Sequence, residues 1–358
     1  TNSSPLTITI PAGAVTGTTR MRISAKYDAY PTSCETGFDG EVEDYALSVQ
    51  APLMVFYSRG SNPALLSSWN TVRTGGGSTP AGFTANNQKF VVQSSYSMTA
   101  DTPWSVSGSN TTVQVENGAV LTANAIISLS SATIFQIDDG ATYNHNVNSG
   151  AVWNGNESIG ISSTINYGLT GEQDVASLSY GNLTVSGGNI KTLVGDVSVE
   201  GILNLINGNI SLGSAAWNLT LGPQASVTAS GGFDNTSMVV CDGSGSLIKQ
   251  GLTPADFSII YPVGTGSYYT PFEITALSAT AAGTGSISVR AVAETAPGPP
   301  SAAGVDLMKY WSITTSNISV TSADIRMRYI NPEEVGPGGD QSRYVPFLYS
   351  DGAWSQPG

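Results

Sequence analysis

A chain of 358 residues has room for two or three domains and ample apolar material for a core, because 40% of its residues are hydrophobic. Only 11% of the residues are charged and 41 are glycine, a composition that favours β-structure with tight turns over helices and argues against disorder. The net charge of −13 argues against nucleic acid and anionic membranes as partners, and no apolar run approaches the ~20 residues that span a bilayer.

Three segments of residues 1–50 alternate apolar and polar side chains, as half-buried strands do. They predict strands over Leu6–Ile10, Met21–Tyr27 and Tyr45–Val49. Three short strands do not make a stable sandwich alone. Residues 1–50 therefore predict a partial β-sandwich module that strands outside this stretch complete.

Within this module, Thr19-Arg20-Met21-Arg22, Cys34 and Gly40-Glu41-Val42-Glu43-Asp44-Tyr45 together resemble the GEVED domain, which is named after this motif. The resemblance implies a secreted surface protein of Bacteroidota, similar to the cargo of the type IX secretion machinery. The family has a cysteine partner in the earlier part of the domain, whereas this sequence has none there, so the pairing of Cys34 stays open. A bridge to the distant Cys241 is not expected.

The hexapeptide also holds the candidate metal ligands. Glu41, Glu43 and Asp44 are candidates for calcium, because hard cations take carboxylate oxygens. The preferred alternative is that these carboxylates pair with Arg20 and Arg22 on the neighbouring strand, or are simply solvated. No other cofactor is predicted, since a zinc site needs three or four closely spaced ligands, which this sequence lacks.

Residues 51–253 contain an internal repeat. Val113–Ala119 recurs 22 residues later as Phe135–Ala141. Val197–Val199 recurs at the same offset of 22 residues as Leu219–Leu221. Each copy is an apolar-polar-apolar triplet followed by a glycine-containing turn, which predicts a right-handed parallel β-helix with equivalent residues on adjacent rungs about 4.8 Å apart. A set of sandwiches is the alternative, but it would not hold a fixed phase between the copies. The aromatic, glycine-rich segment 55–106 is typical of a cap on the first rung.

Residues 254–358 show a different pattern. Alternating segments at Ser286–Val292, Tyr310–Ile313 and Ile325–Tyr329 are separated by Gly/Pro-rich loops, which predicts an immunoglobulin-like β-sandwich. Both this segment and the β-helix resemble regions of the same bacterial surface proteins, in which a C-terminal sorting domain follows. We expect the chain to be either an excerpt of a longer polypeptide or a subunit completed by strands of a neighbouring copy.

The candidates for catalysis are few. His145 is the one histidine, and no Gly-x-Ser-x-Gly elbow with the right context accompanies it. Asp138-Asp139 resembles the acid–base pair of a polysaccharide-degrading β-helix, but the equivalent of this pair in the previous rung is Glu116-Asn117, which favours a role in the turn. Lys191 stands isolated from the acidic residues that a lyase would need. We therefore expect no catalytic residues and no enzymatic activity.

Carbohydrate binding is the remaining alternative, because Tyr143, Trp153, Tyr167 and Trp217 are able to form an aromatic platform. Packing inside the β-helix is the preferred role for these residues. The function expected from the sequence is an extracellular structural or adhesive role at the bacterial cell surface, as a rigid β-helical spacer or filament component. Its expected partners are other copies or domains of the same surface protein, and glycans.

Overall fold

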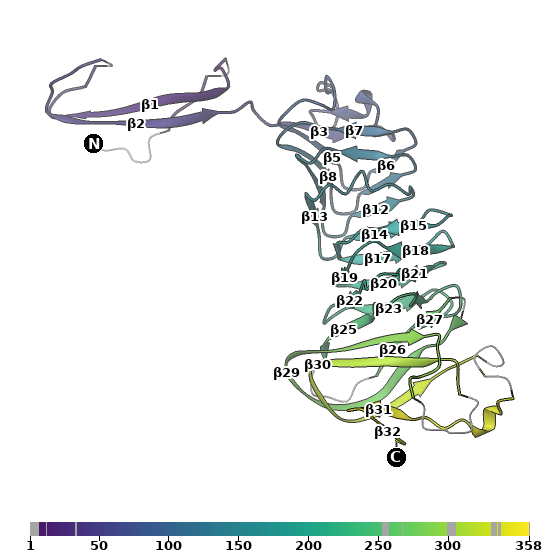
Figure 1. Ribbon diagram of the computed structural model, residues 1–358. Coiled ribbons are helices and arrows are strands. Elements are labelled where there is room, and N and C mark those ends of the chain that lie inside the picture. The colour runs from purple at the N-terminus through teal and green to yellow at the C-terminus, as the bar shows by residue number, and fades with distance from the viewer. Residues whose placement is uncertain are drawn as a thin grey trace. The chain divides into compact units, whose positions relative to one another are not determined.

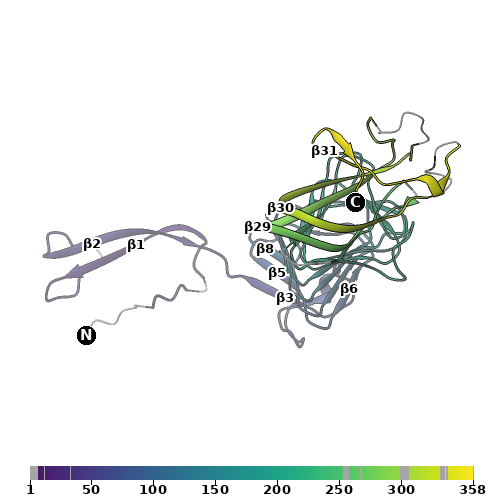
Figure 2. The ribbon, with the colours of Figure 1, turned by 90° about the horizontal axis from the view of Figure 1, so that it is seen from below.

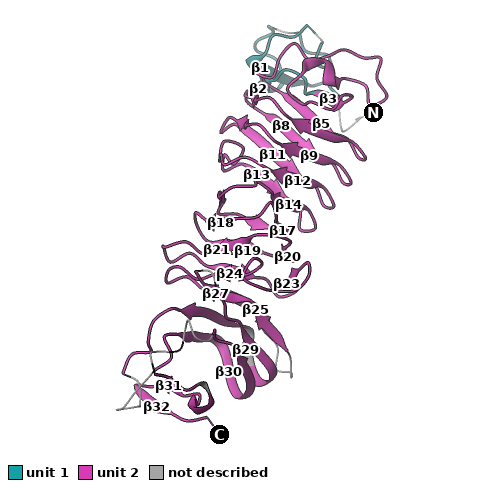
Figure 3. Cartoon of the chain, turned by 90° about the vertical axis from the view of Figure 1, so that its right-hand side faces the viewer, with its two compact units in different colours: residues 1–54 teal, residues 55–358 magenta. Residues whose placement is uncertain are grey.

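The computed structural model describes residues 7–11, 13–32, 34–252, 258–266, 268–298, 306–330, 335 and 338–357. Within these residues the protein is all-β, and its helical content consists of two short 3-10 turns, η1 (Leu66–Ser68) and η2 (Gln341–Arg343). The chain divides into two compact units, residues 1–54 and residues 55–358 (Figure 3). The first boundary lies close to the one that the sequence predicts, whereas residues 254–358 do not separate from the solenoid.

The first unit consists of one antiparallel pair of strands, β1 (Gly17–Lys26) and β2 (Gly40–Val49). Two of the three predicted strands are thus confirmed. Of the third, Leu6 lies outside the described residues, and residues 7–10 form no strand. The described residues therefore form a two-stranded sheet here, and the partial β-sandwich stays a prediction.

The second unit winds into a β-solenoid of about eight turns, in which the strands of successive turns pair with one another to form sheets (Figure 1). A six-stranded sheet contains β3 (Met54–Ser58), β4 (Trp69–Asn70), β5 (Gln88–Val92), β8 (Thr111–Val115), β11 (Thr133–Ile137) and β13 (Glu157–Ile159). A seven-stranded sheet contains β6 (Ser97–Ala100), β9 (Val120–Ala123), β12 (Thr142–His145), β14 (Thr164–Tyr167), β17 (Asn182–Val185), β20 (Ile202–Leu205) and β23 (Ser226–Ala229).

Three further sheets complete the turns. One pairs β7 (Trp104–Val106) with β10 (Ile127–Leu129). The next contains β15 (Gln173–Val175), β18 (Ile190–Leu193), β21 (Asn209–Ser211), β24 (Val239–Val240), β27 (Val263–Thr265) and β28 (Tyr268–Tyr269). The last contains β16 (Ser179–Tyr180), β19 (Val197–Val199), β22 (Leu219–Leu221), β25 (Leu247–Leu252), β26 (Ile259–Tyr261), β29 (Phe272–Val292) and β30 (Tyr310–Met327).

The repeat in the sequence sets the register of adjacent rungs. In the parallel pair β8–β11, Val115 lies opposite Ile137, and the Gly118 amide donates to the Gly140 carbonyl at 3.1 Å. The second repeat is also in register, because β19 pairs with β22 residue for residue. The solenoid and the stacking of these repeats are confirmed. Both glycines have φ near +70°, a conformation that residues with a Cβ avoid.

The interior of the solenoid is filled by side chains at alternate strand positions. Its N-terminal end is aromatic: Trp69, Phe90 and Trp104 are buried, and the rings of Trp69 and Trp104 stack at 5.6 Å. Phe56 stacks on Phe90 at 5.5 Å. These rings close the first turns from water, which is the role of the cap that the sequence predicts.

At the C-terminal end the pairing changes direction. β25 pairs with β29 in antiparallel fashion, and β29 pairs along its length with β30 (Figure 2). Since these hydrogen bonds continue a sheet of the solenoid, the described residues form no separate immunoglobulin-like sandwich, and that prediction is not confirmed. A short hairpin of β31 (Leu348–Ser350) and β32 (Ala353–Ser355) follows, while residue 254, the predicted boundary, lies outside the described residues.

Candidate functional site

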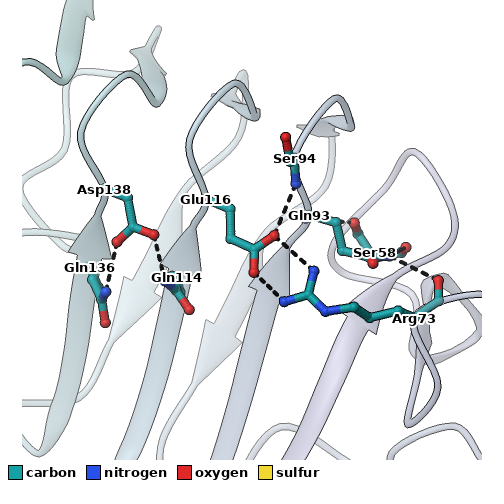
Figure 4. Close-up of polar contacts among 8 residues, drawn as sticks. All are labelled: Ser58, Arg73, Gln93, Ser94, Gln114, Glu116, Gln136 and Asp138. Atoms are coloured by element: carbon teal, nitrogen blue, oxygen red, sulfur yellow. Dashed lines mark hydrogen bonds and ion pairs between the residues drawn. The ribbon is translucent and has the colours of Figure 1, made fainter.

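The Asp138 carboxylate is held by glutamine side chains from two rungs. Gln114 Nε2 donates to Asp138 Oδ2 at 2.6 Å, and Gln136 Nε2 donates to Oδ1 at 2.7 Å (Figure 4). The neighbouring Asp139 Oδ1 accepts the backbone amide of Ser162 at 2.9 Å. These two carboxylates thus bond to their own and adjacent rungs, as expected for residues that build a turn.

Glu116 occupies the position of Asp138 in the previous rung and is also engaged. Arg73 binds its carboxylate through two nitrogens, one of them at 2.9 Å, and the Ser94 amide donates to it at 3.1 Å (Figure 4). The hydrogen bond from Arg73 is the main cause of the lowered pKa of Glu116. One rung further back, Gln93 Nε2 donates to the Ser58 carbonyl at 2.6 Å. Near the ends of these neighbouring strands, side chains therefore form a ladder that binds one rung to the next.

His145 lies inside the solenoid. It is 2% exposed, and its Nδ1 lies 3.1 Å from the Tyr143 hydroxyl on the same inward face of β12. Its ring packs at 5.3 Å from that of Tyr167 and at 5.6 Å from that of Trp153. Burial lowers the pKa of His145 to about 4. The imidazole is therefore a neutral core group.

The aromatic residues considered for a glycan platform separate into two groups. Tyr143 and Tyr167 are buried, and Trp153 packs against the core, so these three rings fill the interior. The Tyr167 hydroxyl lies 2.8 Å from that of Tyr180, which satisfies both groups inside the core. Trp217 alone of the four is exposed. Packing is confirmed for Tyr143, Tyr167 and Trp153, and the four residues form no shared aromatic surface.

Asp44 in the GEVED hexapeptide pairs with arginine. Arg22 Nε donates to Asp44 Oδ1 at 2.7 Å and Arg22 Nη2 donates to Oδ2 at 2.9 Å, while Arg20 lies at 3.6 Å. The hydrogen bond from Arg22 is the main cause of the lowered pKa of Asp44. This is the cross-strand pairing that the sequence offers as the alternative to calcium.

The other two calcium candidates lie on the opposite face of β2. Glu41 and Glu43 alternate with Asp44 along the strand, so their side chains point away from it. The Tyr45 hydroxyl donates to Glu43. Among the described residues, no group of three or more acidic, histidine or cysteine side chains is placed to hold a metal. Calcium at this motif thus stays a prediction without a converging ligand set in its favour.

Lys191 has a role that sequence reasoning missed. The side chain is buried, and its Nζ donates to three carbonyl oxygens of the turns around it, those of Leu169 (2.5 Å), Gly171 (2.8 Å) and Gly188 (2.8 Å). Burial lowers the pKa of Lys191. No sequence signal marks this arrangement, because the acceptors are backbone atoms from two rungs.

Both cysteines are free thiols. Cys34 is an exposed free thiol and Cys241 is a buried one, whose pKa burial raises to about 11. In the part of the chain that the structure describes, no helix has the length and apolar character needed to cross a membrane.

Comparison with known proteins concerns the first unit. The GEVED domain model matches residues 1–48, in agreement with the resemblance carried by the hexapeptide. No curated protein and no solved structure matches the chain. The match therefore concerns the β1–β2 hairpin and its flanks, and the solenoid has to be interpreted from its own residues.

Proposed function

We propose that this chain is an extracellular structural and adhesive protein of the bacterial cell surface, in which the β-solenoid serves as a stiff spacer and no catalysis takes place. The GEVED match at residues 1–48 supports a secreted surface protein of the Bacteroidota type, exported by type IX secretion. The proposed partners are other copies or domains of the same surface protein, and glycans. The net charge of −13 argues against nucleic acid.

One observation carries the spacer role: a sheet of seven parallel strands runs from β6 to β23 with its strands in continuous register. In such a stack each strand donates and accepts hydrogen bonds along the solenoid axis, so bending requires many bonds to lengthen together. About eight turns at about 4.8 Å per turn give a rod of about 38 Å.

The absence of catalysis is proposed from the use of the titratable groups. Asp138, Asp139 and Glu116 are engaged in bonds between rungs, and His145 is buried in the core. An active site requires perturbed groups that converge on an accessible cleft. These four residues do not meet that requirement, which supports a structural role for them.

Stiffness is tested by the distance between nitroxide labels at the two ends of the seven-stranded sheet. Ser97 and Ser226 are exposed and occupy equivalent positions six strands apart, so we expect a narrow distribution centred at about 29 Å. The native thiols are removed first by Cys34→Ser and Cys241→Ala. The same labelled chain in urea provides the broad reference distribution. A broad distribution for the folded chain would contradict a stiff spacer.

Surface location is tested separately. An antibody raised against this chain should label intact, unpermeabilised cells of the source bacterium, and brief external protease treatment should remove the signal. Labelling that requires permeabilisation would refute the proposed location and leave the stiffness of the solenoid unaffected.

A further inference from the structure

A cavity of about 260 Å³ lies at the C-terminal end of the solenoid. Three segments form it: the loop after β23, strand β28, and the residue that follows β30. The side chains that line the cavity combine two aromatic rings with one acid, one base and two small polar groups, and they are Phe233, Asp234, Asn235, Thr236, Tyr269 and Arg328. The volume is below that of sites for drug-sized ligands and suits a single ring-sized group.

The loop that forms one wall is held in place by hydrogen bonds. Asp234 Oδ1 accepts from the Thr236 amide at 2.7 Å and from the Thr236 hydroxyl at 2.8 Å. Asn235 Oδ1 accepts from the Tyr269 amide at 2.8 Å, and its carbonyl accepts from Asn209 Nδ2 at 2.9 Å. These bonds fix the loop to β28 and β21, so the wall is formed before any ligand arrives.

Hydrogen-bonding groups of the residues that line the cavity remain free to bind a ligand. Tyr269 is only 7% exposed and lines the cavity, and among the described residues its hydroxyl has no hydrogen-bond partner. In the same described part of the chain, the Arg328 guanidinium makes no ion pair or hydrogen bond. Asp234 Oδ2 and Asn235 Nδ2 likewise keep free positions. The hydroxyl of a nearly buried tyrosine that lines a cavity and lacks a partner among the described residues is available to a ligand.

The aromatic wall adds an apolar surface. Phe233 is half-buried, packs with Met238 and Val240, and lies 6.5 Å from the Tyr269 ring at an interplanar angle of 31°. The cavity therefore combines a ring surface with both donors and acceptors of hydrogen bonds. A pyranose has this composition, since its C–H groups pack on aromatic rings while each hydroxyl both donates and accepts.

We propose that this cavity is a binding site for one neutral sugar ring of a glycan, in which Arg328 and Asn235 donate to hydroxyl oxygens, Asp234 accepts from hydroxyl groups, and Phe233 packs against the ring. The proposal rests on the adhesive role proposed above and assigns it a ligand class and a place. Burial is the main reason why the pKa of Tyr269 rises to about 12, so this phenol stays protonated and able to donate at neutral pH.

The charges of the lining favour a neutral sugar over an ionic ligand. Asp234 repels phosphate and carboxylate groups, as does a chain with a net charge of −13. Arg328 repels metal cations. A neutral polyhydroxylated ring offers both residues hydrogen-bond partners, because each of its hydroxyls can donate to the acid or accept from the base.

The test begins with the full chain on a glycan array, followed by calorimetric titration with the monosaccharide at the end of the best glycan. Tyr269→Phe removes only the hydroxyl and should weaken binding about 5- to 10-fold, the equivalent of one hydrogen bond. Tyr268→Phe is the matched control, because this neighbour is 38% exposed and does not line the cavity. Tyr268→Phe should bind like the native chain.

A second pair of variants tests the charged wall. Arg328→Met should weaken binding about 10- to 100-fold, as loss of a hydrogen bond from a charged donor does. Arg326→Met, which removes an exposed cation near Glu273 outside the cavity, should leave binding unchanged. Asp234→Asn removes the negative charge but keeps an oxygen that accepts the two bonds from Thr236. This variant should therefore fold, and it tests the acidic side of the cavity as Arg328→Met tests the basic side.

Several results would overturn the site. If no glycan on the array binds, or if only acidic glycans bind, the proposal is wrong. Equal losses in Tyr269→Phe and Tyr268→Phe would place the glycan elsewhere. Failure of the cavity is distinguishable from failure of the spacer, because the label distances of the solenoid do not depend on glycan binding.

Discussion

The lone histidine allows a sharp prediction about stability and pH. His145 is 2% exposed, and burial lowers its pKa from 6.5 to about 4 in the folded chain. Between these two pKa values the unfolded chain binds a proton at His145 and the folded chain does not. The free energy of unfolding therefore contains a contribution that is present above pH 6.5 and is lost as the pH falls towards 4.

The magnitude follows from the two pKa values. At about 1.4 kcal/mol per pKa unit, a fall from 6.5 to about 4 corresponds to about 3 kcal/mol. This amount is a large part of the net stability of an ordinary domain. Because the chain has one histidine, other residues that titrate in this range are mainly carboxylates, and their contribution is common to the native chain and to a His145→Gln variant.

The assay is equilibrium unfolding in urea at pH 4, 5, 6, 7 and 8, followed by tryptophan fluorescence, for the native chain and for His145→Gln. Trp153 lies at 5.6 Å from the His145 ring and reports on this region. We expect the stability difference between native and variant chains to shift by about 3 kcal/mol in favour of the variant between pH 7 and pH 4.

Two observations would refute this reasoning. A native-minus-variant difference that stays constant from pH 4 to pH 7 would show that burial does not depress the pKa of His145. An NMR titration of the single imidazole in the native chain gives a direct measurement, even if the variant does not fold. A midpoint near 6.5 in that titration would contradict a buried, neutral histidine.

Three further predictions concern the turns of the solenoid. Asp138→Asn and Asp139→Asn should leave activity on a panel of acidic and neutral polysaccharides at the level of the native chain, which we expect to be background; turnover abolished by either change would establish an enzyme. Gly140→Ala should lower the unfolding free energy in urea by about 1–2 kcal/mol, because its φ is +73° and a Cβ would lie 2.6 Å from an amide nitrogen. Gly150→Ala, which meets no atom within 4 Å, is the control and should be nearly neutral. Lys191→Met should cost about 2 kcal/mol in the same assay, since it leaves half-buried carbonyls without their donor, and a change below the error of the measurement would contradict that role.

The repeat in the sequence predicts the solenoid where its turns have equal length. Val113 and Phe135 pair across rungs at the offset seen in the sequence. Elsewhere the number of residues between paired positions varies. It is smaller from Thr164 to its partner Asn182 and larger from Ile202 to its partner Ser226. Turns tolerate insertions because they project from the stack, so the strands stay aligned while the period in the sequence is lost.

The C-terminal segment shows the opposite case. Alternation in Ser286–Val292 and Tyr310–Ile313 correctly predicts strands, which form parts of β29 and β30. Alternation does not say which strand a segment pairs with. Here one partner of β29 is β25 of the solenoid, so a sheet continues where the sequence predicts a separate sandwich.

The sequence by itself determined the all-β class, the stacked rungs and the GEVED motif of this protein, because each depends on local alternation, glycine turns or a contiguous string of residues. Tertiary structure alone decided that His145 faces the core, since period two assigns residues to a common face but not to the inside. It also decided the carbonyl partners of Lys191 and the cavity of Phe233, Tyr269 and Arg328. Those sites unite backbone and side-chain atoms from distant segments, and only the winding of the chain brings them together.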